Sequence, residues 1–87
     1  MRAELLRKIS KEFNRFRSPE CRAGIVENGE KTIKIEFSGT SASFSCCFDE
    51  HFEDYRIMME EGGTKTKIER VERKGIEKFI VSYMRHE

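Results

Sequence analysis

Hydrophobic side chains in the first seventeen residues recur at helical spacing. Over residues 2–17 they fall within about 100° of arc when each residue turns the chain by about 100°. The residue before a proline is pushed out of the α region, so Ser18-Pro19 ends this segment. The pattern predicts an amphipathic helix over residues 2–17. Its apolar stripe contains Leu5, Leu6, Ile9, Phe13 and Phe16, and its opposite face Arg7, Lys11, Asn14 and Arg15.

Apolar and polar residues then alternate, as they do in half-buried strands, and glycine-containing turns separate the alternating runs. The loop Glu27-Asn28-Gly29 predicts a first hairpin in which Ile25 pairs with Lys31. This register places Cys21, Ala23 and Ile25 on the same face as Ile33, Ile35 and Phe37. Residues 43–48 alternate again and predict a third strand with Phe44 toward the core.

The stretch from Asp49 to Glu61 fits two structures. As a helix it has apolar side chains at helical spacing, Asp49 as N-cap and Gly62 just past its end. As a strand it pairs across Gly62-Gly63, with Glu60 opposite Lys65. This register also places Met59 opposite Thr66 and Ile57 opposite Ile68, which gives one continuous apolar face, so we favour a strand over residues 54–61. Two glutamates in a last helical turn would also oppose the helix dipole.

The turn at Lys74-Gly75 predicts a last hairpin that aligns Ile68 with Val81 and Arg70 with Phe79. The expected fold class is α+β, with the N-terminal amphipathic helix packed on an antiparallel β-meander of five or six strands. The alternative places a second helix at about 49–61, which gives the order α-β-β-β-α-β-β. We expect one domain over residues 1–87, because 87 residues form a single small core.

Composition limits the function. With 37% hydrophobic and 38% charged residues, the chain has little interior for a deep ligand cavity, and a shallow surface is expected to act instead. The charged composition resembles that of heat-adapted proteins. We expect a cytoplasmic protein, since no apolar run approaches the roughly 20 residues of a membrane span and the N-terminus does not resemble a signal peptide. Its three cysteines should be reduced.

Charge is unevenly distributed. Residues 1–18 carry six Lys/Arg and two Glu, residues 49–61 six Asp/Glu and one Arg, and residues 64–87 seven Lys/Arg and four Glu. Internal charge complementarity is the simplest interpretation. The sharper one is nucleic-acid binding through a basic helix face and the last hairpin, although interleaved glutamates favour salt bridges between strands. The residues that would contact nucleic acid are Arg7, Lys11, Arg15, Lys65, Lys67, Lys74 and Lys78.

The chemical candidates are sparse. Cys46-Cys47 with His51 could form a nucleophile or a metal site, but adjacent strand residues point to opposite faces and the spacing of structural zinc ligands is absent. Acidic residues around His51 lack the spacing of a calcium loop. We therefore predict no catalytic residue, no cofactor and no metal.

Three apolar residues, Val71, Ile80 and Met84, fall on the otherwise polar face of the predicted last strands. An exposed apolar patch favours a partner surface. The leading hypothesis is a non-enzymatic binding or assembly module, either a homodimer or a small subunit of a complex. The alternatives are a nucleic-acid-binding accessory protein and an enzyme or metal protein centred on Cys47 and His51.

Overall fold

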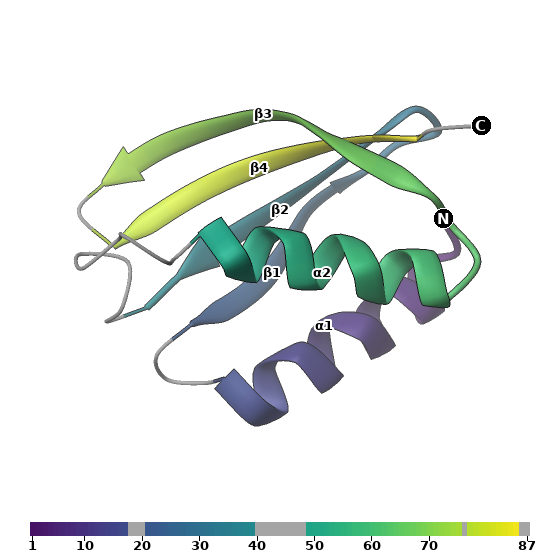
Figure 1. The fold of residues 1–87 in the computed structure, drawn as a ribbon, viewed down its shortest axis with the longest axis horizontal. Coiled ribbons are helices and arrows are strands. Elements are labelled where there is room, and N and C mark those ends of the chain that lie inside the picture. Colours follow the sequence, from purple (N-terminus) through teal and green to yellow (C-terminus); the bar gives the residue numbers. More distant parts are fainter. Residues whose placement is uncertain (18–20, 40–48, 76, 86–87) are drawn as a thin grey trace.

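The computed structural model describes residues 1–17, 21–39, 49–75 and 77–85, and within them the chain forms two helices and four strands (Figure 1). The α+β class is confirmed. The predicted strand over 43–48 lies outside the described residues. The elements are α1 (Ala3–Arg17), β1 (Arg22–Asn28), β2 (Thr32–Ser38), α2 (Asp49–Glu61), β3 (Thr66–Gly75) and β4 (Lys78–Arg85).

The strands form one antiparallel sheet in the order β1-β2-β4-β3. This order corrects the predicted meander, because β4 inserts between β2 and β3 rather than adding to an edge. Since β2 and β3 both run antiparallel to β4, they are parallel to each other, and α2 connects them. The unit β2-α2-β3 with β4 between its strands is a split β-α-β unit.

Residues 49–61 form helix α2, so the predicted strand over 54–61 is wrong and the alternative helix is right. Its end is closed by a Schellman motif, in which the Gly63 amide donates to the Glu60 carbonyl and the Thr64 amide to the Met59 carbonyl. Gly63 has φ +100°, the left-handed conformation that this motif requires.

Burial explains why the helix wins. Phe52, Tyr55 and Met59 are at most 4% exposed, and each such side chain contributes about 1.5–3 kcal/mol when removed from water. The unfavourable glutamates at the end of α2 cost only about 0.3–1 kcal/mol each. The energy of burial therefore exceeds the dipole term, and the register across Gly62-Gly63 that favoured the strand does not form.

Both hairpins differ from the predicted registers. Ile25 pairs with Ile35 instead of Lys31, and a bulge follows between Ile25 and Glu27. In the last hairpin Ile68 pairs with Tyr83 instead of Val81, with irregularities between Ile68 and Arg70 and between Arg73 and Gly75. Both turns lie further along the chain than the glycine signals predict, because Asn28 pairs with Ile33 and Gly75 with Lys78.

Both helices cover the same face of the sheet (Figure 1). The inner face of the first hairpin was predicted correctly for Cys21, Ala23, Ile33, Ile35 and Phe37, all of which are buried. Two expected core residues are exposed, Ile25 on the edge strand β1 and Phe16 near the end of α1, the latter by 74%. At that end of the helix Arg17 covers Phe13 instead, with its guanidinium carbon 4.4 Å from the ring centre.

Aromatic contacts join the two layers. The Phe37 ring of β2 meets Phe13 of α1 at 5.7 Å and Phe52 and Tyr55 of α2 at 4.9 and 5.6 Å between ring centres. The Tyr83 hydroxyl donates a 2.7 Å hydrogen bond to the Phe52 carbonyl. None of the helices in the described residues is long and apolar enough to cross a membrane.

The cap of α2 can be tested by Gly63→Ala. An added Cβ meets nothing within 4 Å, so the only cost is the positive φ, and we expect a loss of about 1–2 kcal/mol in the free energy of unfolding measured in urea. Gly24→Ala is the matched control. Its site is equally open but lies in a strand with ordinary φ, so it should be neutral or stabilising. An equal effect of the two substitutions would contradict the assignment of this cap.

Candidate interaction surfaces

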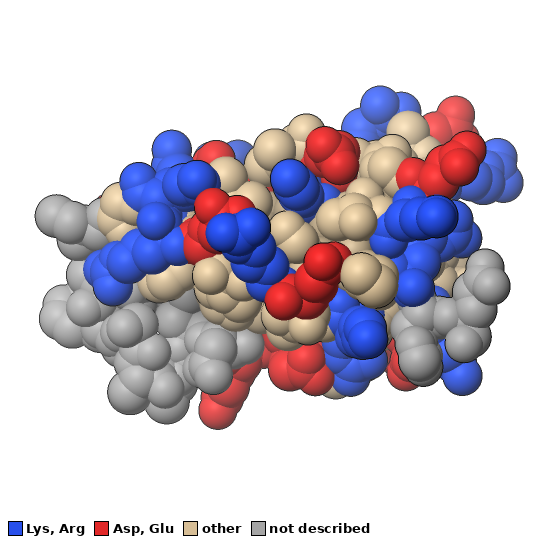
Figure 2. Space-filling model, turned by 90° about the horizontal axis from the view of Figure 1, so that it is seen from above, with Lys and Arg blue, Asp and Glu red and all other residues tan. Residues whose placement is uncertain are grey.

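No described helix covers the second face of the sheet, and charged side chains of both signs gather there. Figure 2 shows this mixture over β3 and β4, where blue and red side chains lie side by side. Pairing in the sheet brings Lys34, Ser82 and Arg70 into one row and Glu36, Ile80 and Glu72 into the next. We call this surface the uncovered sheet face. Its basic residues are Arg22, Lys34, Lys67, Arg70, Lys74 and Lys78, and its acidic residues Glu27, Glu36, Glu69 and Glu72.

Ion pairs between neighbouring side chains tie several of these charges together. Glu72 lies 3.0 Å from Lys74 and 3.4 Å from Arg70, and Lys78 lies 3.8 Å from Glu36. The hydrogen bond from Lys74, aided by the charge of Arg70, lowers the pKa of Glu72. Because these pairs are exposed to solvent, each contributes little to stability.

The three predicted interface residues do not share one face. Val71 pairs with the buried Val81, so it lies on the helix-covered side, at the edge of the sheet, and is 45% exposed. Ile80 and Met84 do lie on the uncovered sheet face, where both are half-buried. The bulge after Ile68 shifts Val71 to the other side, and this shift cannot be read from alternation alone.

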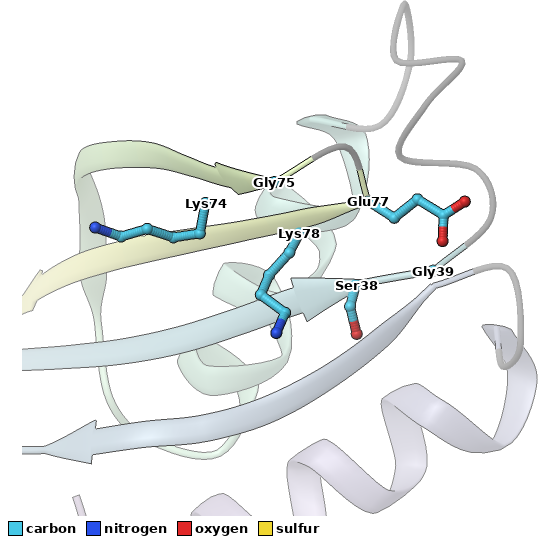
Figure 3. A pocket seen from close by; sticks show the side chains of 6 residues that line it. All are labelled: Ser38, Gly39, Lys74, Gly75, Glu77 and Lys78. Atoms are coloured by element: carbon cyan, nitrogen blue, oxygen red, sulfur yellow. The ribbon is translucent and has the colours of Figure 1, made fainter.

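Shallow hollows border this face, and two of them are lined by several of its charged residues. One of about 230 Å³ is lined by Lys34, Arg70, Ser82 and their neighbours. The other, of about 500 Å³, lies at the β3–β4 end of the sheet (Figure 3). There the side chains of Lys74 and Glu77 point away from each other, and Lys74 and Lys78 are paired with glutamates. Ser38 also lines the larger hollow.

The free edge of β1 is closed by a side chain. The Asn14 amide group of α1 accepts a 2.6 Å hydrogen bond from the Ala23 amide and donates a 3.0 Å hydrogen bond to the Ala23 carbonyl. It thus occupies the two backbone groups of Ala23 that a further strand would use at this position. The sequence offers no signal for this contact, because Asn14 falls among the polar residues of the helix.

The other edge strand, β3, is protected differently. Two irregularities interrupt its pairing, and its ten residues are mostly exposed and charged. Bulges and charges on edge strands oppose pairing with a further strand. Both edges are therefore poor docking sites for an added strand.

The helical layer separates charge by helix. The exposed residues Arg7, Lys8, Lys11 and Arg15 form a basic ridge along α1, and Glu50, Glu53, Glu60 and Glu61 form an acidic ridge along α2. The predicted nucleic-acid contacts Arg7, Lys11 and Arg15 thus belong to the helical layer. Lys67, Lys74 and Lys78 lie on the uncovered sheet face, and Lys65 is exposed between α2 and β3. The structure does not bring the two sets together on one surface.

Ion pairs within the layer neutralise only part of the charge on the two helices. Within the described residues, Arg17 and Asp54 form the salt bridge between the helices, at 3.3 Å. Arg56 pairs within its own helix, with Glu53 at 3.0 Å and Glu60 at 3.8 Å. Most of the charge on the two ridges faces outward.

The described thiol is protected from reaction. Cys21 is fully buried, and burial raises the pKa of its thiol to about 12. Cys46 and Cys47 lie outside the described residues. His51 is half-buried, with its ring 6.1 Å from that of Phe13. Across the described ranges, no cluster of His, Cys, Asp and Glu side chains has the arrangement of a metal site.

Comparison with known proteins identifies no relative of this chain. No protein-family model, no curated protein and no solved structure matches the chain.

Replacing Asn14 tests the closed edge. Asn14→Ala removes the partner of the Ala23 amide and of the Ala23 carbonyl. We expect it to lower the free energy of unfolding by about 1–3 kcal/mol. Lys11→Ala on the exposed side of the same helix is the control and should change stability by less than about 0.5 kcal/mol. If the two variants unfold at the same urea concentration, Asn14 does not hold this edge.

Buried hydroxyl and thiol groups predict weaker folding in alkali. Burial raises the pKa of Tyr55 to about 12, although the hydrogen bond with Ser10 acts to lower it. Burial likewise raises the pKa of Cys21. The unfolded chain loses these protons at lower pH than the folded chain. Stability is therefore complete below about pH 9 and falls by about 1.4 kcal/mol per pH unit for each group as the pH rises toward 12.

Urea unfolding at a series of alkaline pH values measures this effect. Tyr55→Phe removes one titrating group, so its stability should fall less steeply with pH than that of the wild type. Phe16→Leu, which replaces an exposed apolar side chain, should keep the wild-type slope. A midpoint that stays constant up to about pH 11 would contradict the prediction.

Proposed function

We propose that the chain is a non-enzymatic binding module that contacts a protein partner through the uncovered sheet face. The observation that carries this proposal is the placement of both helices on one side of the sheet, which leaves the strands of the other side as a broad surface. Ile80 and Met84 supply its half-buried apolar positions. Side chains on adjacent strands present a pattern of charge that a complementary protein surface could match.

The chemistry of this face supports a protein partner over nucleic acid. Glu36 and Glu72 lie on either side of Ile80 in one row of the surface and would repel a phosphate backbone. No aromatic side chain of the described strands faces this side to stack on a base, since Phe37, Phe79 and Tyr83 all face the helices. The uncovered sheet face carries six basic and four acidic side chains. This excess of basic residues makes nucleic acid the second candidate.

The surface also supports contact rather than catalysis. Enzyme sites combine a concave pocket with polar groups that converge on one point. The hollows on this side are shallow, and the lysines of the larger one are engaged by Glu36 and Glu72.

Site-directed photo-crosslinking in the source organism tests the proposal. A benzoylphenylalanine at Lys67 or Ile80 should give one adduct of discrete mass, whereas the same residue at Lys8 on α1 should not give that adduct. The partner identified from the adduct is then purified and titrated. Lys34→Glu with Arg70→Glu should weaken its binding at least about tenfold, since like charges then face each other, while Lys8→Glu should leave it unchanged.

Two results would overturn the proposal. One is the absence of any adduct from the sheet positions, and the other is a purified partner whose affinity does not respond to the Lys34 and Arg70 substitutions. A partner that proves to be nucleic acid, with an affinity that falls steeply with salt, would establish the second candidate instead.

A further inference from the structure

The two ridges of the helical layer form a surface that is complementary to itself. Helix α1 carries five basic and two acidic residues between Ala3 and Arg17, and α2 carries one arginine and six acidic residues between Asp49 and Glu61. The helices pack side by side, and packed helix axes lie about 8–10 Å apart. A basic strip and an acidic strip therefore run next to each other on one outer surface.

The helices are antiparallel. Contacts join the end of α1 to the early part of α2 through Arg17 and Asp54, and Ser10 to Tyr55 further along. A Cβ on Gly62, past the end of α2, would meet Ile9 at 3.4 Å. Both ridges thus extend along the same length of the molecule.

We propose that a second copy of this chain docks on the helical layer, with the basic ridge of each copy against the acidic ridge of the other. A two-fold axis that runs between the helices and parallel to them places α1 opposite α2 of the partner, twice. A two-fold axis across the helices would place like charges together. Charge complementarity thus selects the first arrangement.

The exposed apolar side chains of the layer suit the same contact. Ile57 is 42% exposed within the acidic ridge, and Phe16 is 74% exposed at the end of α1. Their burial would add to the electrostatic attraction. An extended polyanion fits this surface poorly, because the acidic ridge lies within about one Debye length of the basic one.

The size of the layer indicates a weak dimer. At about 1.5 Å per residue the helices are about 22 and 20 Å long, and together they offer a flat area of roughly 400 Å² per copy. Stable interfaces bury about 800 Å² per partner, so association should be transient and sensitive to salt. In such a dimer both uncovered sheet faces point outward. The dimer therefore goes beyond the proposed function, because it makes the module bivalent.

Exchange of charge between the ridges tests the proposal. One variant carries Lys8→Glu and Lys11→Glu, and a second carries Glu50→Lys and Glu61→Lys. The control carries Arg22→Glu and Lys67→Glu on the uncovered sheet face. Sedimentation equilibrium at about 100 μM protein and about 10 mM salt, where the Debye length is about 30 Å, reports the mass of each.

We expect the average mass of the wild type and of the control to rise from the 10.3 kDa of the monomer toward twice that value, and to return to it in about 1 M salt. Each ridge variant alone should dimerise at least about tenfold more weakly, because like charges then meet at both contacts. An equimolar mixture of the two should restore the dimer, since its charges are again opposite. A chain with all four substitutions should dimerise by itself.

The mixture and the fourfold variant also show that the ridge variants are folded. A monomeric wild type at low salt, a mixture that stays monomeric, or a control that loses the dimer would each overturn the inference. None of these measurements involves the sheet-face partner, so failure here and failure of the proposed function are distinguishable.

Discussion

The aromatic ring of Phe37 is the contact on which the arrangement of layers depends. It projects from β2, an interior strand of the sheet, and meets rings from both helices. Aromatic pairs of this geometry contribute beyond the area they bury. Because one side chain packs against α1 and α2 together, both helices must lie on the same side of the sheet. The second face is left without a cover as a direct result.

Surface charge follows from that arrangement in two different ways. On the sheet, acidic and basic residues come from neighbouring strands and pair closely, as Glu72 does with Lys74. On the helical layer, most basic residues lie on α1 and most acidic residues on α2, and Arg17 with Asp54 bridges the two helices. A mixed surface and a segregated surface thus stand on opposite sides of one thin fold. The first suits a partner of matched pattern, and the second suits a copy of itself.

Local patterns predicted the elements whose apolar periodicity is strong. The helix over the first seventeen residues and the inner face of the first hairpin are confirmed, with Cys21, Ile33 and Ile35 buried as expected. The choice of a strand for α2 was wrong because it depended on a register across Gly62-Gly63, whereas Gly63 caps the helix and the apolar side chains of α2 are buried in the core. The registers were wrong because both turns lie further along the chain than predicted, so that Asn28 and Gly75 pair within strands instead of forming the turns.

The sequence by itself determined the α+β class, the apolar stripe of α1 and the uneven charge of its segments, since these depend on residue type and spacing along the chain. Tertiary structure decided the strand order, the side on which Val71 lies and the role of Asn14 at the edge of β1. Each of these depends on contacts between residues distant in the chain. It likewise decided that the basic and acidic segments lie next to each other and face outward, because only packing fixes which side of a helix remains in water.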